Sequence, residues 1–432
     1  MLLTKAEQEC QLKEYISTFD GAPKQDTNEW LRARKRTIGG SEMATIQGKG
    51  YFSSIPKLIA EKIGIIPRRR SIQMQWGKLF EPNICAYVET DFDTKILAQD
   101  LFIPGKFPTQ SYSPDGLGVV ELEFSYEHRG QKHTYHRWVT ALFEFKTPYS
   151  RQVKDNGTIP DYYESQVKAG LDTIDLSEIG IYAEAMFRKC EWTDIGFNCL
   201  YDKSLTPRDT IRDASNVIAY GFVIFYGKYS TVPKHTNKQI LNHQRLSNVL
   251  SDMGARPINC ADIKDGCDFA DIGGFPLETM EVVMDEYESK NIRGFYSSIF
   301  YRDKIVTNVG QEENWQGVYE HEENAKGSEL RHAIWELSHN MHVMKEAGYD
   351  VYGVLPWKLF KIGYAFVDKE VGYLNQYKNT IDEIMSLVNL CNDNPENKTK
   401  YYNDYMQVDR DMERIEDDYD GYFKKGGALV TS

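Results

Sequence analysis

Two short acidic motifs in this chain have the residue types of a metal-dependent phosphodiesterase. Ser113-Pro114-Asp115-Gly116 is followed further along the chain by Glu144-Phe145-Lys146. Carboxylates hold hard divalent cations through their oxygens, and such cations bind phosphate and lower the pKa of an attacking water. Each motif alone is common, because Asp-Gly occurs in many turns and an acid two residues before a lysine occurs on many exposed strands.

The residues around Glu144 indicate that its carboxylate needs a partner. Residues 140–148 form an apolar, β-rich run that would normally be buried. An unpaired charge in such a run costs on the order of several kcal/mol, so we expect a cation, an arginine or a metal to face Glu144. The alternative is that Glu144 and Lys146 form a pair on the solvent face of an amphipathic strand. The two motifs alone leave both interpretations open.

The apolar spacing along the chain predicts an α/β or α+β fold, with a central sheet flanked by helices. Helices are expected over residues 5–17, from a cap at 26–28, from Ser41, and over 56–63, 71–90, 161–174, 277–286, 328–345 and 373–390. Strands are expected over residues 96–98, 117–124, 134–145, 179–187, 218–226 and 352–361. The segment 127–130 has the composition of a turn between two of these strands.

Composition indicates a globular protein with a sizeable core. The chain has 432 residues, of which 41% are hydrophobic, enough for one large or several ordinary domains. It has no long apolar run and no apolar segment of a secretory signal near its start, so we expect an intracellular protein with no membrane partner. The seven cysteines are scattered, as is typical of reduced core thiols. A zinc site could nominally use His332, Glu336, His339 and His342, but a polar helix surface is the simpler interpretation.

Charge is distributed unevenly along the chain. The net charge of −13 argues against a protein that coats nucleic acid nonspecifically. Residues 21–80 nevertheless carry twelve Lys or Arg against four Asp or Glu, whereas residues 401–420 carry eight acids against two arginines. An acidic protein with one basic face can bind a polyanion there and repel it elsewhere.

Three further features accompany the two acidic motifs. Glu81 lies inside the expected helix 71–90, beside apolar neighbours. An arginine-rich segment that includes Arg34 leads to Ser41 at the expected start of a helix, where backbone N–H groups and the helix dipole favour phosphate. Gln166 lies on the expected helix that follows the Glu-x-Lys strand.

In this order, a helix acid, a strand Asp, a strand Glu-x-Lys and a helix Gln, the chain resembles the lambda-exonuclease-like group of PD-(D/E)xK nucleases, also called YqaJ-type viral recombinases. The resemblance covers about residues 30–187 and resumes at about 353–390, where the closing strand and helix of that fold would fit. It implies a restriction-endonuclease-like core, with a mixed sheet flanked by helices and interrupted by a large insertion.

The resemblance implies a role for each matching residue. Asp115, Glu144 and the backbone carbonyl of Phe145 would ligate the catalytic Mg²⁺ or Mn²⁺, and Glu81 would hold a second ion directly or through water. Lys146 would position the attacking water and stabilise charge on the phosphate. The pocket for the 5′-phosphate of the digested strand would comprise Arg34, Ser41, Ser113 and Gln166. A planar guanidinium can bind a phosphate through two N–H groups at once.

The resemblance further implies a metal-dependent 5′→3′ exonuclease that acts on the ends of double-stranded DNA. Such an enzyme releases mononucleotides and leaves a 3′ single strand for viral recombination, replication or repair. The resemblance also implies a homo-oligomer in the form of a trimer, a single-strand annealing protein as partner, and a phage or large DNA virus as source. The enzyme would then work in the host cytoplasm or at a viral replication site.

Two alternatives to this activity stay open. One is an endonuclease or an RNA-degrading nuclease of the same fold, which only substrate assays separate from an exonuclease. The other is a catalytically silent scaffold that binds DNA ends. The presence of Glu81, Asp115, Glu144 and Lys146 argues against the scaffold, because a silent protein has no chemical need for all four.

The expected domains are an N-terminal helix, a nuclease core, an insertion or accessory region, the closing strand and helix of the core, and an acidic tail. Their bounds are 1–25, 26–202, 203–350, 351–392 and 393–432. The span from Asp115 to Glu144 is longer than the family's short connection, so a hairpin over 119–138 is expected to project from the sheet edge. Within it, Glu121-Leu122-Glu123 offers a competing register, but only Glu144 is followed two residues later by a lysine.

Overall fold

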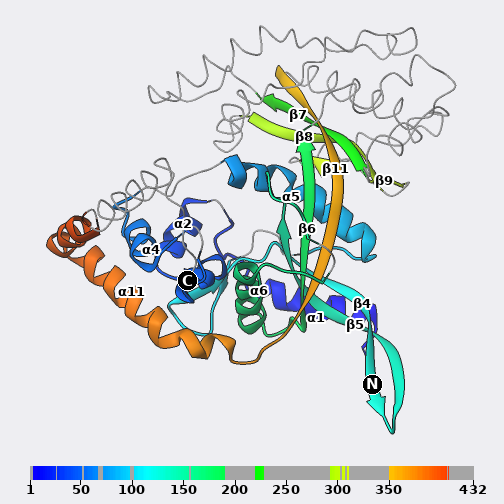
Figure 1. Cartoon of the computed structure of the whole chain (residues 1–432), viewed down its shortest axis with the longest axis horizontal. Helices are drawn as coiled ribbons and strands as arrows, with labels where there is room; N and C mark the ends of the chain where they lie inside the picture. Colours follow the sequence, from blue (N-terminus) through cyan, green and yellow to red (C-terminus); the bar gives the residue numbers. More distant parts are fainter. Residues whose placement is uncertain are drawn as a thin grey trace, which may run out of the picture.

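A mixed β-sheet forms the centre of the molecule (Figure 1). The computed structural model describes residues 3–25, 27–50, 53–66, 72–97, 102–154, 157–189, 219–227, 292–301, 304–306, 309–310, 350–405 and 407. Among these residues the sheet has eight strands, in the order β10, β8, β7, β11, β6, β5, β4, with β9 paired to β8. Their bounds are β4 Gly116–His128, β5 Gln131–Lys146, β6 Ile179–Lys189, β7 Ala219–Gly227, β8 Ile292–Tyr301, β9 Lys304–Val306, β10 Val309–Gly310 and β11 Asp350–Asp368.

One strand pair of this sheet is parallel, and it needs a crossover. β5 and β6 run parallel, whereas the other described pairs of the sheet are antiparallel. A parallel pair cannot be joined by a tight turn. The helix α6, Asp161–Thr173, makes the connection and begins directly after Pro160, a residue with a fixed φ that suits the start of a helix.

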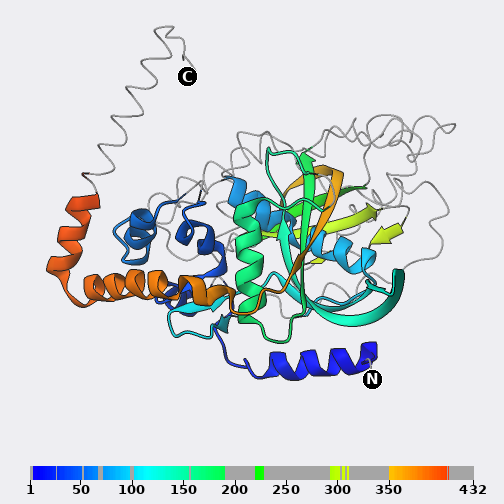
Figure 2. The ribbon, with the colours of Figure 1, turned by 60° about the horizontal axis from the view of Figure 1, so that its bottom comes forward.

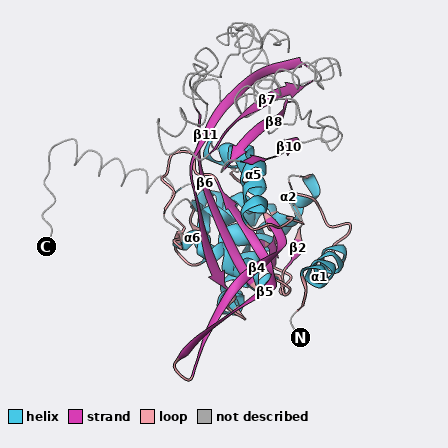
Figure 3. Ribbon diagram, turned by 90° about the vertical axis from the view of Figure 1, so that its right-hand side faces the viewer, coloured by secondary structure: helices cyan, strands magenta, loops and turns pink. Residues whose placement is uncertain are grey.

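Helices cover both faces of the sheet (Figures 2 and 3). On one face lies α5, Ile72–Asp91, where the rings of Phe80 and Phe187 stack with centroids 4.5 Å apart. The other face is covered by α6 and by α1, Lys5–Ser17, whose Leu12 packs in one cluster with Leu142 and Leu171. Alternate residues of β5 therefore point to two different helical layers, as the period of a strand requires.

A second group of short elements lies beside α6. It contains α2 Asn28–Lys35, η1 Gly40–Glu42, α3 Met43–Ile46, α4 Ile55–Lys62, η8 Tyr373–Tyr377, α11 Lys378–Asp393, and a small sheet of β1 Ile38–Gly39, β2 Ile103–Pro104 and β3 Gln110–Tyr112. Side-chain oxygens of Thr27 and Ser54 cap α2 and α4. The predicted helix start at Ser41 is wrong in detail, since Ser41 lies within η1, which begins at Gly40 after the extended Gly39.

The β4–β5 hairpin keeps one register from end to end. Gly116 pairs with Phe143 at one end and His128 with Gln131 at the other, with no shift between them. The turn residues Arg129-Gly130 have φ values of 52° and 75°, as in the type I′ turn whose twist suits a two-residue hairpin. The tip projects from the edge of the sheet, as the sequence predicts (Figure 3). The long span after Asp115 is therefore a regular ladder.

The predicted mixed α/β fold class is confirmed, and so are the expected helices at 5–17, 56–63, 71–90 and 161–174. The helices predicted at 277–286 and 328–345, with the histidines discussed as a zinc site, lie outside the described residues. β7 and β8 fall within the predicted insertion, yet they extend the central sheet beyond β11. None of the described helices has the length and hydropathy of a membrane span.

Candidate active site

The register of the hairpin brings the two predicted strand acids together. One step beyond the Gly116–Phe143 pair, the same ladder places Asp115 next to Glu144. The backbone N–H of Phe145 donates to Asp115 Oδ2 at 2.7 Å. The two carboxylates thus meet at the end of β5, on neighbouring strands.

The competing acids lie far from this point. Glu121 pairs with Trp138 and Glu123 pairs with His136, and both glutamates are exposed. Neither can approach Asp115, which directly precedes Gly116, the first residue of β4. The acid beside Asp115 is therefore Glu144.

Both oxygens of the buried Glu144 carboxylate accept hydrogen bonds. The Tyr112 hydroxyl donates to Oε2 at 3.0 Å. Gln166 Nε2 donates to Oε1 at 2.5 Å, and the Lys146 ammonium also donates to Oε1. Burial raises the pKa of Glu144 to about 7, with the nearby Asp115 carboxylate as the second cause. Further positive charge at this point would favour the ionised form of Glu144.

The three oxygens predicted to bind a metal converge on one ammonium group. Lys146 Nζ donates to Glu144 and to the Phe145 carbonyl oxygen, the latter at 3.0 Å, and lies 3.7 Å from Asp115 Oδ2. Burial lowers the pKa of Lys146, but Glu144 and then Asp115 raise it above its ordinary value, so the ammonium stays charged. Oxygens that already surround one cation fit Mg²⁺ or Mn²⁺, which prefer carboxylate and carbonyl ligands.

Glu81 lies half-buried on α5, close to the end of β5. The Thr147 hydroxyl, directly after β5, donates to the carbonyl oxygen of Gly77 at 3.2 Å, and Glu81 follows Gly77 by about one helical turn. Within the described part of the chain, no three Asp, Glu, His or Cys side chains form a group that could hold a metal. The metal-binding role of Glu81 stays a prediction.

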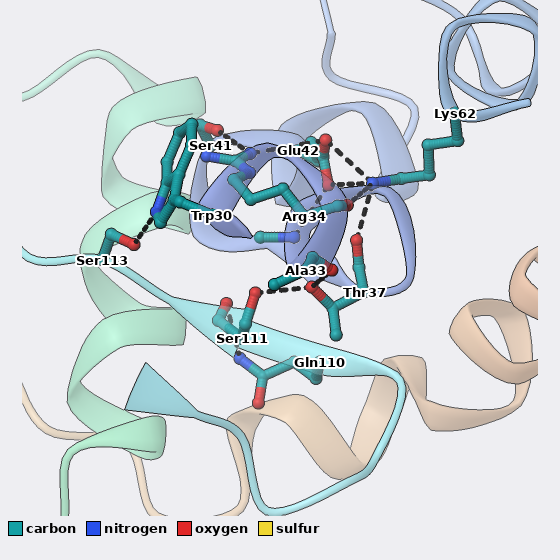
Figure 4. A network of polar contacts seen from close by, with 11 residues as sticks. Trp30, Ala33, Arg34, Thr37, Ser41, Glu42, Lys62, Gln110, Ser111 and Ser113 are labelled. Carbon is teal, nitrogen blue, oxygen red and sulfur yellow. Dashed lines mark hydrogen bonds and ion pairs between the residues drawn. The ribbon is translucent and has the colours of Figure 1, made fainter. Parts of the chain in front are cut away.

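Three of the four predicted 5′-phosphate residues lie around Trp30 (Figure 4). Arg34 Nη2 donates to Ser41 Oγ at 3.1 Å, and Trp30 Nε1 donates to Ser113 Oγ at 3.1 Å. The guanidinium carbon of Arg34 lies 5.1 Å from the centre of the Trp30 ring, within the range of a cation–π contact. We use the name arginine pocket for the cluster of side chains formed by Trp30, Arg34, Ser41 and Ser113.

Two adjacent glycines connect the arginine pocket to the metal-site residues. A Cβ at Gly39 would lie 2.7 Å from Arg34 Nη2, and a Cβ at Gly40 would lie 2.2 Å from the ring of Tyr112. Neither glycine has a positive φ, so the neighbouring side chains, and not the backbone conformation, disfavour a larger residue at these positions. The Tyr112 hydroxyl in turn donates to Glu144. The Gly39-Gly40 segment therefore packs both against Arg34 and against a hydrogen-bond partner of Glu144.

Gln166 contacts the metal-site side of this arrangement. Its amide donates to Glu144, and the preceding Ser165 donates to Gln47, directly after α3, at 2.7 Å. The helix α6 thus joins β5 to the group of short elements that carries Ser41. The predicted phosphate-binding role of Gln166 stays a prediction.

A comparison with protein-family models identifies the domain that contains these site residues. Residues 29–175 match the model of the YqaJ-like viral recombinase domain, and this range includes the arginine pocket, Asp115, Glu144, Lys146 and Gln166. Residues 29–175 form a YqaJ-like viral recombinase domain. The resemblance drawn from the sequence motifs is confirmed.

Curated relatives with sequence similarity come from African swine fever virus. Proteins of the isolates Tick/Malawi/Lil 20-1/1983 and Tick/South Africa/Pretoriuskop Pr4/1996 are each 27% identical to this chain over 211 residues. The similar region is 46% of this chain, and the chain spans 61% of the length of those proteins.

Solved structures with some likeness to the chain include an alkaline exonuclease from Laribacter hongkongensis, LHK-Exo. It has 16% sequence identity and a TM-score of 0.26, over 37% of this chain and 73% of that chain. Its complex with dAMP has 19% identity and a TM-score of 0.27 over the same shares. TM-scores of this size do not establish a common fold, so the YqaJ-like domain rests on the family match.

Four residues that the motifs did not single out as functional also contact the predicted site residues. They are Trp30, Glu42, Lys62 and Tyr112. A sequence pattern could have predicted Lys62, because it follows Leu58 by four positions on the buried side of α4, where a lysine needs a partner. No local pattern could have predicted Tyr112, since its partner Glu144 lies on another strand.

Proposed function

We propose that the YqaJ-like domain is a Mg²⁺- or Mn²⁺-dependent 5′→3′ exonuclease that acts on ends of double-stranded DNA. It would release mononucleotides and leave a 3′ single strand. The observation that carries the proposal is the convergence of Asp115, Glu144 and the Phe145 carbonyl oxygen on one cation, close to the arginine pocket. An endonuclease has no need of a pocket for a terminal phosphate, so the pairing of the two features favours an exonuclease.

The metal-site residues have separate tasks in this proposal. A bound divalent ion would polarise the scissile phosphate and lower the pKa of an attacking water. Asp115, Glu144 and the Phe145 carbonyl oxygen would hold that ion. Tyr112 and Gln166 fix the plane of the Glu144 carboxylate through its two oxygens, as outer-shell donors do for metal ligands.

Lys146 would stabilise the negative charge that develops on the phosphate. Its ammonium is charged, and it lies at the point where the predicted ligands meet. The Tyr163 ring, 5.1 Å from Nζ, limits its movement from one side. A fixed cation of this kind contributes most in a site with little water.

The arginine pocket would bind the 5′-phosphate. Arg34 can give the phosphate two parallel N–H bonds, while Ser41 and Ser113 can each donate one hydroxyl. Trp30 holds the pocket together, because its ring contacts Arg34 and its N–H donates to Ser113.

We extend the proposal to the setting of the enzyme. A homo-oligomer in the form of a trimer would enclose the duplex and make digestion processive, and a single-strand annealing protein would take up the product for recombination. A viral source and an intracellular place of action belong to the same proposal. The description of the matched family as a viral recombinase and the African swine fever virus relatives support it.

Nucleotide release from linear duplex DNA tests the proposed activity. A 5′-phosphorylated duplex is incubated with Mg²⁺ and the wild type, Glu144→Ala or Lys146→Ala protein, with EDTA as the control for metal dependence. Wild type should release mononucleotides and both variants should be inactive. Equal release by all three proteins would overturn the site assignment, and cutting of closed circular DNA as fast as linear duplex would overturn the exonuclease mode.

A further inference from the structure

Two charged side chains beside Arg34, the buried Lys62 and the half-buried Glu42, have no task in the mechanism above (Figure 4). Glu42 Oε1 lies 3.4 Å from Arg34 Nη2, and Lys62 Nζ lies 3.0 Å from Glu42 Oε2. The side chains of Lys62 and Glu42 are only 4% and 19% exposed. Glu42 lies in η1, the same 3₁₀ turn that carries Ser41, and from there it contacts both cations.

Lys62 joins three segments of the chain through one ammonium group. It donates to the carbonyl oxygen of Arg34 at 3.0 Å, to that of Thr37 at 2.6 Å, and to Glu42 Oε1 at 3.1 Å. The last carbonyl groups of a helix such as α2 lack helical partners. Lys62 thus fixes the backbone end of the helix that carries Arg34 and, with it, the carboxylate that contacts the Arg34 guanidinium.

The backbone at Gly39 holds the other side of Glu42. The Gly39 N–H donates to Glu42 Oε2 at 2.7 Å, and the Arg34 guanidinium packs against Gly39 itself. Burial raises the pKa of Glu42, but Lys62 and Arg34 lower it to below its ordinary value. Glu42 is therefore an ionised carboxylate, held from two directions.

Stability alone does not explain this arrangement. Apolar residues of similar volume often stabilise a protein as well as a buried ion pair does, because both ions lose their hydration. A carboxylate beside a phosphate pocket also opposes the binding of an anion. Glu42 has both of these disadvantages, and its presence is accounted for if it determines the orientation of Arg34.

We propose that Glu42, fixed by Lys62, is a positioning residue that orients Arg34 and gives the enzyme its preference for a 5′-phosphate over a 5′-hydroxyl end. This inference rests on the proposed function. Within the described structure, Ser41 and Glu42 both contact Nη2 of the guanidinium, which fixes the orientation of its plane. Two cations and one carboxylate also keep one net positive charge, which favours a terminal dianion and limits the attraction of internal phosphates.

Binding of two duplexes that differ only at the 5′ end tests this inference. The affinities of 5′-phosphorylated and 5′-hydroxyl duplex are measured in Ca²⁺, whose loose coordination supports binding without organising the reaction. Glu42→Gln should reduce the preference for the phosphorylated end about tenfold and leave the affinity for the hydroxyl end within about twofold. Lys62→Met should act in the same direction, and Glu42→Asp, which keeps the charge, should recover part of the preference. Glu29→Gln, at an exposed glutamate of α2, is the matched control.

Each outcome is decisive. A folded Glu42→Gln protein with the wild-type preference overturns the inference, and so does an equal loss of affinity for both ends, which a structural role would produce. If Glu42→Gln does not fold, an unchanged preference in Glu42→Asp and Lys62→Met overturns it in the same way. Wild type without any preference for the phosphorylated end would overturn the proposed function and this inference together.

Discussion

The predicted metal-site residues and the charged residues at the arginine pocket form two clusters with an excess of opposite charge. At the metal site two carboxylates, Asp115 and Glu144, surround one ammonium group, and the pKa of Glu144 is raised to about 7, mainly by burial. Behind the pocket two cations, Arg34 and Lys62, surround one carboxylate, and they lower the pKa of Glu42 despite its burial. The first cluster therefore has an excess of negative charge, and the second has an excess of positive charge.

This difference indicates what each cluster would bind. A cluster with an excess of carboxylate is stabilised by a cation, and a cluster with an excess of guanidinium and ammonium is stabilised by an anion. A divalent metal and a terminal phosphate are the matching ligands. Gly39 and Gly40 let these opposite clusters pack against successive residues of one backbone segment. Variants that change one cluster should therefore leave a distinct signature from variants that change the other.

The largest effect is expected at Glu144. Glu144→Gln keeps the shape of the side chain but removes the charge that would hold the ion, so nucleotide release should fall by about 10³-fold on phosphorylated and hydroxyl ends alike. Steady-state rates on the two duplexes measure this. A selective loss on phosphorylated ends would contradict the assignment of Glu144 to the metal site.

A smaller loss of rate is expected at Lys146, with the opposite effect on metal affinity. Lys146→Met should lower the rate by about 10² to 10³-fold, while Mn²⁺ should bind at least as tightly as to wild type because a competing cation is gone. Activity and Mn²⁺ binding by calorimetry are measured on the same protein. Loss of Mn²⁺ binding in Lys146→Met would show that the lysine builds the site rather than acting on the phosphate.

The two glycines give a matched pair of variants. Gly40→Ala would push a Cβ into the buried Tyr112 ring and break its bond to Glu144, so metal affinity should fall by about 10 to 100-fold. Gly39→Ala would displace only the flexible end of Arg34, so the preference for phosphorylated ends should fall by about tenfold with metal affinity unchanged. Metal titrations and the rate ratio for the two duplexes separate these results. The same pattern in both variants would mean that the two clusters are not independent.

The smallest effect is the pH dependence of stability due to Glu42. Its pKa is lowered in the folded protein from an ordinary value of 4.5, so its ionised form stabilises the fold above that pH and the contribution is lost as the pH falls through the folded value. The free energy of unfolding of wild type should therefore exceed that of Glu42→Gln at pH 7, and the difference should shrink below pH 4.5. Urea unfolding of both proteins and of Glu29→Gln measures it. A difference that does not change with pH would contradict an ionised Glu42.

The convergence of Asp115 and Glu144 could be predicted from the sequence because both lie at the same end of one hairpin. Apolar alternation indicates β4 and β5, and an acid two residues before a lysine marks the end of β5. The register that places Asp115 beside Glu144 then follows from a tight turn and an unbroken ladder. Local patterns are sufficient when both partners lie on adjacent strands.

The rest of the site could not be predicted because its contacts join distant segments. Lys62 reaches Glu42 from another helix, and Tyr112 reaches Glu144 from the small second sheet. Such contacts depend on how α4 and β3 pack, which no spacing in the sequence records. The hydrogen bond from the Gln166 amide to Glu144 is a contact of the same kind, and the predicted phosphate-binding role of Gln166 stays a prediction.

The preference for a 5′-phosphate over a 5′-hydroxyl end in Arg34→Lys tests the division into two clusters most directly. Lysine keeps the charge but loses the planar pair of N–H donors. The ratio of rates on phosphorylated and hydroxyl duplex should fall by about tenfold while the rate on hydroxyl ends and the metal affinity stay at wild-type values. Arg32→Lys, at an exposed position of the same helix, should change nothing. An unchanged ratio in Arg34→Lys, or an equal loss on both ends, would contradict a separate site for end recognition.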